Sequence, residues 1–542
     1  MPMKPLKQIV FSSIIVASLL GSSSAWAAGL DADALKTGNG QILSDVSTLA
    51  GIGEFEDTDG ASLEAAFRAP GSVLQMTDGS LLIADTRNHV IRKVNGGQVI
   101  TFAGPEVAIL KNSQGFPTGG LLDGKASEAF FNEPSGLAQD AKGNVYVADA
   151  GNNAIRKIDA SGMVSTVAGN GVPGNKDGKG AAASFNHPSD IAVTADGTIY
   201  VADSLNHAIR KITTDGQVTT LTASASRVIQ IRPGEASFAG DFNDGALAKA
   251  AFNEPSGLAL DSKGNLFVSD TGNQRIRYID FGTGLVTTVA GSTPTVTTSS
   301  IYGKNELYAE GDFADGEALK SKFDFPKGLA VTSEGGLIIA DSLNHSVRYL
   351  LNGKVTTLAG TLQTGETDGV EQAAQFYNPT DVLVTTQGNL IVADASNNKI
   401  RKITPYQLPS SISNDGKVKV VSGTKLISFD AQPEIQDGRT MVPVRAISET
   451  FGYKVTYVER AGKSVVQLSK DDLTVELTIG ETGIVKKQTG AADRKIETDV
   501  APYVKQDRTY VPVRFFAEQI GLDVQWDAAH QTAILRTKSF VK

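Results

Sequence analysis

The chain has 542 residues, of which 41% are hydrophobic and 20% charged, a composition typical of globular domains. This composition excludes a disordered chain and a polytopic membrane protein, and the length allows about three domains, or one large repeat fold with one further domain. Lys and Arg number 50 against 59 Asp and Glu, so the formal charge of −9 argues against binding of nucleic-acid phosphates. The chain has no cysteine, which excludes disulfides, iron–sulfur clusters and Cys nucleophiles.

Residues 1–27 have the parts of a secretory signal peptide. Lys4 and Lys7 form a positive start, residues 9–20 are mostly apolar, and residues 25–27 have the small-x-small pattern of a cleavage site. The apolar run is too short to cross about 30 Å of hydrocarbon comfortably, and an uncleaved N-terminal anchor is the alternative. We expect cleavage after Ala27 and no membrane span in the mature chain, which would be secreted or associated with the cell envelope.

One sequence unit occurs six times along the next part of the chain. Its centre reads, for example, VYVADAGNNAIRKI (145–158), with an apolar run on either side of an Asp-x-x-Asn turn. The Asp recurs as Asp85, Asp149, Asp203, Asp270, Asp341 and Asp394. A Phe-x-x-Pro pair precedes each unit, and an apolar run and a Gly-containing turn typical of a hairpin follow each Pro. With a last strand such as STVAG (165–169), each unit predicts four short antiparallel strands, and a ring of such sheets is a β-propeller.

The last strand of the repeat also occurs before the first unit. STLAG (47–51) matches it, whereas no copy follows the sixth unit. We therefore predict a mainly β fold, a six-bladed propeller over residues 44–404, in which the N-terminal strand closes the last blade. This pairing would satisfy backbone groups that an open sheet edge leaves exposed.

The turns after the repeated Asp carry an Asn-His-hydrophobic element. It stands as Asn88-His89-Val90, Asn206-His207-Ala208 and Asn344-His345-Ser346, while Asn153, Gln274 and Asn398 occupy the His position in the other units. These units resemble the NHL-repeat family of propellers over about 360 residues, a likeness that implies the fold and not an activity.

The repeated charged residues favour a structural interpretation, because catalysis needs one site and not six copies. An Arg lies on each third strand, near enough to pair with the Asp across the hairpin: Arg92, Arg156, Arg210, Arg277, Arg348 and Arg401. The Asp of each inter-blade loop, such as Asp59, is expected to stabilise a turn or cap a short helical stretch such as residues 61–67. Calcium binding by these loop acids is the alternative.

The loops before blades 2, 4 and 5 are the longest and lie on one face of the predicted ring. Variable loops on a rigid face are where recognition usually occurs, and aromatic and Arg side chains are common interface anchors. The candidate ligand-binding residues are therefore Phe116, Arg227, Arg232, Phe238, Tyr302 and Tyr308. The alternative is that these loops only cover the blade ends.

Acidic residues near the predicted central channel are few. Among the residues just after the Pro of each first strand, only Asp190 and Asp381 are acidic, and they belong to opposite blades. They are weak candidates for a metal site, which needs three or more ligands. His89, His207 and His345 alternate at one repeat position and could face the channel. The chain has no catalytic motif that we recognise, so we predict no catalytic residue and no cofactor.

The region after the propeller has its own duplication. Residues 405–417 are polar and turn-rich and read as a linker. In residues 418–542, GRTMVPVRAISETFGYKVTY (438–457) matches DRTYVPVRFFAEQIGLDVQW (507–526). Each copy predicts a strand, a helix of about two turns bounded by Pro and Gly, and an alternating strand. The expected domain is a small α+β unit of two similar halves.

These VPVR-helix-Gly-strand motifs resemble the copper amine oxidase N-terminal-like domain, also called the stalk domain. The resemblance implies an accessory module of exported bacterial proteins. It does not imply amine oxidation, because this region has a single His, His530, and lacks the cofactor motif. Arg445 and Arg514 either face a ligand or pair with Glu449 and Glu518 one helical turn later.

Together these features predict an exported, non-enzymatic binding or scaffold protein of a bacterium. Its propeller face would recognise an extracellular protein or a cell-wall glycan, with the C-terminal domain as stalk or cell-envelope module. The alternative is a propeller lyase or hydrolase with a divalent metal in the central channel. The sequence leaves open the ligand, the oligomeric state and the relative motion of the two domains.

Overall fold

The computed structural model of the chain describes residues 29–30, 34–105, 111–113, 115–232, 234–293, 300–498 and 500–540. The expected signal peptide, residues 1–27, lies outside these ranges. Within them, no helix is both long and apolar enough to cross a membrane.

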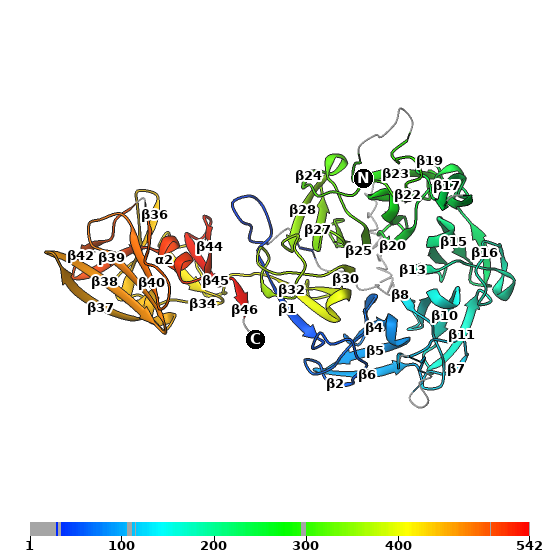
Figure 1. The fold of residues 1–542 in the computed structure, drawn as a ribbon, viewed down its shortest axis with the longest axis horizontal. Helices are drawn as coiled ribbons and strands as arrows, with labels where there is room; N and C mark the ends of the chain where they lie inside the picture. Colours follow the sequence, from blue (N-terminus) through cyan, green and yellow to red (C-terminus); the bar gives the residue numbers. More distant parts are fainter. Residues whose placement is uncertain are drawn as a thin grey trace, which may run out of the picture.

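Six antiparallel sheets surround a common axis, and we call them blades 1 to 6 in chain order (Figure 1). The first strand of each blade contacts the first strands of both neighbouring blades, so these strands form a closed inner circle. In blades 1 to 3 the four main strands, from the axis outward, are β3 (Ser72–Gln75), β4 (Leu81–Asp85), β5 (Val90–Asn95) and β6 (Gln98–Ala103); β8 (Pro134–Gln139), β9 (Val145–Asp149), β10 (Ala154–Ile158) and β11 (Met163–Ala168); and β13 (Pro188–Val193), β14 (Ile199–Asp203), β15 (Ala208–Ile212) and β16 (Gln217–Thr220). In blades 4 to 6 they are β20 (Pro255–Leu260), β21 (Leu266–Asp270), β22 (Arg275–Asp280) and β23 (Leu285–Ala290); β25 (Pro326–Val331), β26 (Leu337–Asp341), β27 (Ser346–Leu351) and β28 (Lys354–Ala359); and β30 (Pro379–Val384), β31 (Leu390–Asp394), β32 (Lys399–Pro405) and β1 (Ser44–Ala50).

The N-terminal strand closes the ring as the sequence predicted. Strand β1 pairs antiparallel with β32 of the last blade, with Ser47 opposite Lys402 and Thr48 opposite Arg401. The two ends of the repeat region are therefore held together by backbone hydrogen bonds, and β32 has no open outer edge.

The hydrophobic core lies between neighbouring blades. Between blades 2 and 3, for example, Tyr146 and Ala148 of one sheet pack with Val201 of the next. Phe185, from the Phe-x-x-Pro pair, is fully buried in the same cluster. Because each cluster needs side chains from two sheets, a single blade cannot bury its own apolar faces.

A buried ionic network organises each blade, which confirms the structural role expected for the repeated Asp and Arg. In blade 2, Asp149 accepts hydrogen bonds from Asn152 Nδ2 at 2.8 Å, from Arg156 Nη1 at 2.7 Å and from the backbone N–H of Asn132 at 2.7 Å. The other blades repeat the Asp–Arg ion pair as Asp85–Arg92, Asp203–Arg210, Asp270–Arg277, Asp341–Arg348 and Asp394–Arg401. Every one of these Arg side chains is at most 1% exposed, so each buried guanidinium depends on its carboxylate partners.

The loop Asp residues belong to this network and do not cap helices. Asp123 accepts from Arg156 Nη2 at 2.8 Å and from the backbone N–H of Thr166 on β11 at 3.0 Å. The helical stretch expected at residues 61–67 is instead a turn. Where a helix forms at this position it is one 3-10 turn: η3 (Gly180–Ala182), η5 (Leu247–Lys249) or η7 (Ala318–Lys320). Short strands before it add to the outer edge of each blade: β2 (Gly60–Ala61), β7 (Gly124–Lys125), β12 (Gly178–Lys179), β19 (Gly245–Ala246), β24 (Gly316–Glu317) and β29 (Asp368–Val370).

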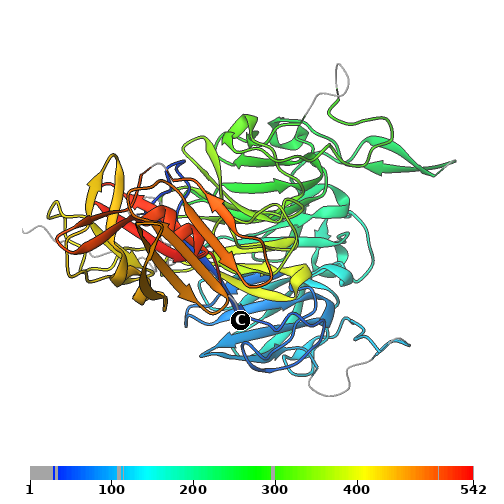
Figure 2. The same ribbon diagram turned by 60° about the vertical axis from the view of Figure 1, so that its left-hand side comes forward.

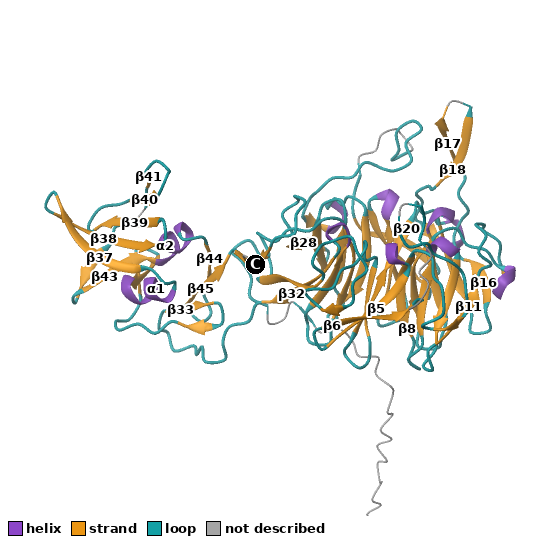
Figure 3. Ribbon diagram, turned by 60° about the horizontal axis from the view of Figure 1, so that its bottom comes forward, coloured by secondary structure: helices purple, strands orange, loops and turns teal. Residues whose placement is uncertain are grey.

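Two further features lie on the face where the inter-blade loops gather. The turn after the second strand is a 3-10 turn in five blades: η1 (Thr86–Asn88), η2 (Ala150–Asn152), η4 (Ser204–Asn206), η6 (Thr271–Asn273) and η8 (Ala395–Asn397). A separate hairpin, β17 (Arg227–Arg232) and β18 (Glu235–Ala239), belongs to none of the blades and stands off the propeller (Figure 3).

The C-terminal domain consists of three small sheets and two helices. Their elements are β33 (Lys419–Ser422), β34 (Lys425–Leu426), β35 (Glu434–Gln436), β36 (Arg439–Pro443), α1 (Val444–Thr450), β37 (Lys454–Arg460), β38 (Lys463–Lys470), β39 (Leu473–Thr478), β40 (Ile484–Gln488), β41 (Arg494–Ile496), β42 (Tyr503–Lys505), β43 (Arg508–Pro512), α2 (Val513–Gln519), β44 (Leu522–Asp527) and β45 (Thr532–Thr537). The last strand, β46 (Ser539–Phe540), belongs to the sheet of blade 6. The two duplicated motifs form equivalent strand–helix–strand units, as predicted. The Arg445–Glu449 and Arg514–Glu518 ion pairs are not among those formed by the described residues.

The C-terminal domain docks on blade 6 (Figures 1 and 2). Strand β46 pairs with β29, so the end of the chain extends the last blade of the propeller. Tyr406, in the segment expected to be a linker, is 5% exposed and packs with Leu43 and Ile534. At Tyr406 this segment is therefore packed in place and does not act as a flexible linker.

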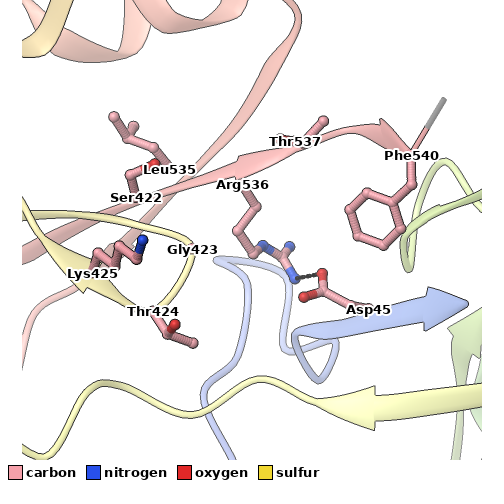
Figure 4. A pocket seen from close by; sticks show the side chains of 9 residues that line it. All are labelled: Asp45, Ser422, Gly423, Thr424, Lys425, Leu535, Arg536, Thr537 and Phe540. Carbon is pink, nitrogen blue, oxygen red and sulfur yellow. Dashed lines mark ion pairs between the residues drawn. The ribbon is translucent and has the colours of Figure 1, made fainter. Parts of the chain in front are cut away.

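A buried arginine holds the junction between the domains. Arg536 of β45 donates to both carboxylate oxygens of Glu371, at 2.9 and 2.8 Å, and to Asp523 at 2.7 Å. Figure 4 shows the pocket of about 340 Å³ beside it, where Arg536 also lies 3.7 Å from Asp45 of β1. The side chains of Arg536 and Glu371 are 2% and 1% exposed, so neither charge has water to replace its partner.

Candidate functional site

The residue before the Pro of each first strand adopts an unusual backbone conformation. Its φ lies between 47° and 53° in all six blades, at Ala69, Glu133, His187, Glu254, Phe325 and Asn378. Such a φ costs about 1–3 kcal/mol for a residue other than glycine, so surrounding contacts must hold it. These residues start the inner circle of strands on the face of the inter-blade loops, and their type differs between blades, whereas the Phe and the Pro of the segment are the same in all six.

A side chain from the preceding blade holds each of these residues. The backbone N–H of Glu133 donates to His89 Nδ1 at 3.0 Å, and that of Glu254 donates to His207 Nδ1 at 3.1 Å. The same bond is made to Asn153, Gln274, His345 and Asn398. The position taken by His in three repeats therefore needs a hydrogen-bond acceptor, which Asn and Gln also supply. This interaction fastens each blade to the next.

The three histidines act as neutral acceptors in these contacts. Burial lowers the pKa of His89 and His345, and it lowers the pKa of His207 to about 4. A protonated imidazole could not accept the bond at Nδ1. These side chains join blades, and none of them is the channel-facing ligand considered from the sequence.

Ionisable side chains from four blades meet beside these strand starts, and we call Glu133, His187, Glu254, Tyr308 and Lys327 the axial cluster. His187 Nε2 lies 3.7 Å from a carboxylate oxygen of Glu133, and Tyr308 donates to Glu254 at 3.0 Å. Burial raises the pKa of Glu254, while Tyr308, His187 and Lys327 counteract the rise. Burial also lowers the pKa of Lys327, opposed by Glu254. Such perturbed groups gathered in one place are typical of a binding or catalytic site.

The carboxylates of Asp190 and Asp381 accept hydrogen bonds mainly from backbone N–H groups. Asp190 accepts the N–H of Ile191 and of Leu258 in the next blade, both at 2.8 Å. Asp381 accepts from Ser72 Oγ at 2.7 Å and from two backbone N–H groups. Burial raises the pKa of Asp381 to about 6; burial and the charge of Asp381 raise that of Asp190. Each carboxylate fastens its blade to the next one.

No group of three His, Asp or Glu side chains in the described ranges is arranged to hold a metal ion.

The six loop residues predicted to bind a ligand lie in three places. The Arg227 guanidinium lies 3.6 Å from the ring centre of Tyr302 and donates to the carbonyl of Glu306 at 2.6 Å. Tyr302 is 4% exposed, so these two residues pack the loop before blade 5 against the hairpin. Tyr308 of the same loop reaches the axial cluster, where its ring meets Phe325 edge-on.

The remaining three are exposed and lie apart from the cluster. Phe238 is 69% exposed on the hairpin, and Arg232 is exposed near its tip. Phe116 is 43% exposed and packs edge-on against Phe55, with Arg68 near both rings. Of the six, the structure thus places only Tyr308 in the axial cluster.

Sequence reasoning missed Glu133, His187, Glu254 and Lys327 as a group. It considered the residues after each Pro for acidity, whereas three of these four precede the Pro. Variation at the position before the Pro was the available signal, although the position after the Phe varies as well, as Arg68, Asn132, Asn186, Asn253, Asp324 and Tyr377.

The sequence matches known families in both parts of the chain. The NHL repeat matches residues 185–212, 252–277 and 323–348, and the Teneurin NHL domain matches residues 119–176. The Copper amine oxidase N-terminal domain matches residues 420–535. Both resemblances drawn from the sequence are confirmed.

Several proteins are similar to the propeller part. Protein SUPPRESSOR OF QUENCHING 1, chloroplastic, of Arabidopsis thaliana is 31% identical over 294 residues, 52% of this chain and 26% of that protein. Human NHL repeat-containing protein 2 is 31% identical over 357 residues, 61% of this chain and 46% of that protein. The chain thus spans less than half of these relatives. The crystal structure of an auxiliary nutrient binding protein from Bacteroides thetaiotaomicron is 14% identical with a TM-score of 0.46, covering 67% of this chain and 76% of that one.

Proposed function

We propose that this chain is an exported, non-enzymatic binding protein of a bacterium. Its propeller recognises an extracellular protein or a cell-wall glycan on the face of the axial cluster, and the C-terminal domain serves as stalk or cell-envelope module. The axial cluster carries the proposal, because it gathers carboxylate, imidazole, ammonium and phenol groups beside loops that differ in length between blades. The signal-peptide pattern of residues 1–27 supports export.

The chemistry of the cluster suits recognition of a polar ligand. Strained backbone and inter-blade hydrogen bonds hold Glu133, His187 and Glu254 in place, so little ordering remains to be done when a ligand binds. Burial and the neighbouring Glu254 raise the pKa of Tyr308, which keeps its hydroxyl protonated as a hydrogen-bond donor. The ring of Phe325 adds an apolar surface beside these donors and acceptors.

A divalent-metal lyase or hydrolase fits the geometry less well. The carboxylates of Asp190 and Asp381, which the sequence offered as ligands, already accept backbone N–H groups. A metal would have to replace these bonds and would leave buried N–H donors without partners.

The proposal is tested by calorimetric titration of residues 28–542 with soluble cell-wall glycan fragments and with candidate envelope proteins. We expect saturable binding that Glu254→Gln weakens about tenfold, since the variant removes a charged hydrogen-bonding group. Glu128→Gln is the matched control, because Glu128 is an exposed carboxylate paired only with Lys125. Stoichiometric metal in the purified chain that is lost in Asp190→Asn would instead favour the enzyme.

A further inference from the structure

The C-terminal domain has a groove of about 840 Å³ in its second half. It is lined by buried apolar residues, among them Val513 and Val524, and by the half-buried rings of Phe515 and Trp526. Ile435 of β35, which is 50% exposed, also lines the groove. A groove of this size lies within the range of small-ligand sites in proteins.

The duplication within the domain shows that these aromatic rings are special to the second half. Phe515 corresponds to Ala446 in the first motif, and Trp526 corresponds to Tyr457. The first half keeps the same strand–helix–strand fold with a smaller aliphatic residue and a 48% exposed Tyr. The fold of this unit therefore does not require the Phe–Trp pair, although both rings also pack against the hydrophobic core of the domain.

The polar lining of the groove is balanced in charge and rich in hydrogen-bonding groups. Its lining includes the charged Arg439, Arg514, Glu497 and Glu518 and the uncharged Thr440, Thr498 and Gln525. Arg514 and Glu518 are exposed, and neither takes part in an ion pair with the described residues. A guanidinium and a carboxylate on one helix thus face the groove without neutralising each other.

We propose that this groove binds a neutral oligosaccharide. Sugar rings have apolar C–H faces that stack on aromatic side chains, and their edges carry hydroxyl groups that both donate and accept hydrogen bonds. Phe515 and Trp526 would contact the ring faces, while Arg514, Glu518 and Gln525 would bind the hydroxyls. A charged polymer fits less well, because each sign of charge would meet a like charge in the lining. This inference rests on the proposed function only for the export of the chain.

The sequence supplies a reporter for this groove. The chain has two tryptophans, Trp26 and Trp526, and the first lies in the expected signal peptide. In residues 28–542, Trp526 is therefore the sole tryptophan, and its fluorescence reports the groove and not the propeller. The probes are β-1,4-linked tetramers of glucose and of N-acetylglucosamine and a neutral hydrophilic decapeptide. We expect saturable quenching by at least one sugar and none by the peptide.

The internal duplication provides matched controls. Arg514→Gln and Phe515→Ala should each weaken sugar binding about tenfold, since they remove a charged hydrogen-bonding group and a stacking surface. Arg445→Gln and Tyr457→Ala, at the equivalent positions of the first half, should leave the affinity unchanged. Melting temperatures of all four variants check that they fold.

The outcomes separate this site from the propeller. Glu254→Gln should leave the Trp526 response unchanged even if it abolishes binding at the axial cluster. No saturable response to either sugar, a saturable response to the peptide, or equal weakening by the first-half variants would each overturn the proposal.

Discussion

Replacing Arg536 by Met tests whether the two domains form one cooperative unit. The substitution keeps an aliphatic side chain but removes the only cation that contacts Glu371 among the described residues. Glu371 would remain buried with one backbone donor, the N–H of Ser44 at 2.8 Å. Breaking a buried ion pair by removing one partner costs about 3–5 kcal/mol. We expect this loss in the free energy that couples the C-terminal domain to blade 6.

Denaturant unfolding with two probes measures that coupling. Trp526 fluorescence follows the C-terminal domain, and far-ultraviolet circular dichroism follows mainly the propeller strands. The two transitions should coincide in the parent chain, and in Arg536→Met the fluorescence transition should occur at a lower denaturant concentration. A double variant with Glu371→Gln should lose less than the sum of the single losses, because Glu371 is no longer left as an unpaired buried charge, although Asp523 still loses its ion pair with Arg536.

The control is Arg508→Met in the same domain. Arg508 also binds a carboxylate, that of Asp430, but both side chains are about half exposed, so the loss should stay below about 1 kcal/mol. If Arg536→Met shifts neither transition more than this control, the buried junction does not couple the domains and the reasoning is refuted.

Three further changes test the propeller. Burial lowers the pKa of His207 from 6.5 to about 4, so the contribution of His207 to the free energy of unfolding is complete above pH 6.5 and falls by roughly 3 kcal/mol as the pH drops to 4. His207→Gln, which keeps a hydrogen-bond acceptor, should remove this part of the pH dependence of stability. If calorimetry gives the same pH profile for the variant and the parent chain, this prediction is wrong. A Cβ at Gly257 would lie 2.1 Å from the carbonyl oxygen of Lys327, so Gly257→Ala should lower stability by about 1–3 kcal/mol, and an unaltered melting temperature would count against tight packing of the inner strands. Asp149→Leu should lower the free energy of unfolding in urea by about 3–5 kcal/mol, and the double variant Asp149→Leu/Arg156→Met should lower it less. Equal losses would show that the unpaired buried guanidinium of Arg156 is not the cause.

Local patterns in the sequence were enough to predict the propeller. Each strand is only a few residues long, and Pro, Gly and Asp-x-x-Asn signals lie within the same short segment as the hydrogen bonds that they direct. The placement of residues 47–51 beside the last blade followed from the missing strand at residue 404, because an unpaired edge is unfavourable. The two halves of the C-terminal domain were recognised for the same reason, since Pro443 and Gly452 mark the helix ends locally.

The functional residues depended on contacts that sequence position does not reveal. Glu133 and Glu254 are 121 positions apart and become members of one cluster because their blades are arranged around a common axis. Arg536 meets Glu371 only after the C-terminal domain has folded and docked. The sequence alone thus determined the repeated sheets, whose hydrogen bonds are local. Tertiary structure decided which charged side chains share a buried environment, because that proximity arises from packing between distant segments and sets their desolvation and pairing.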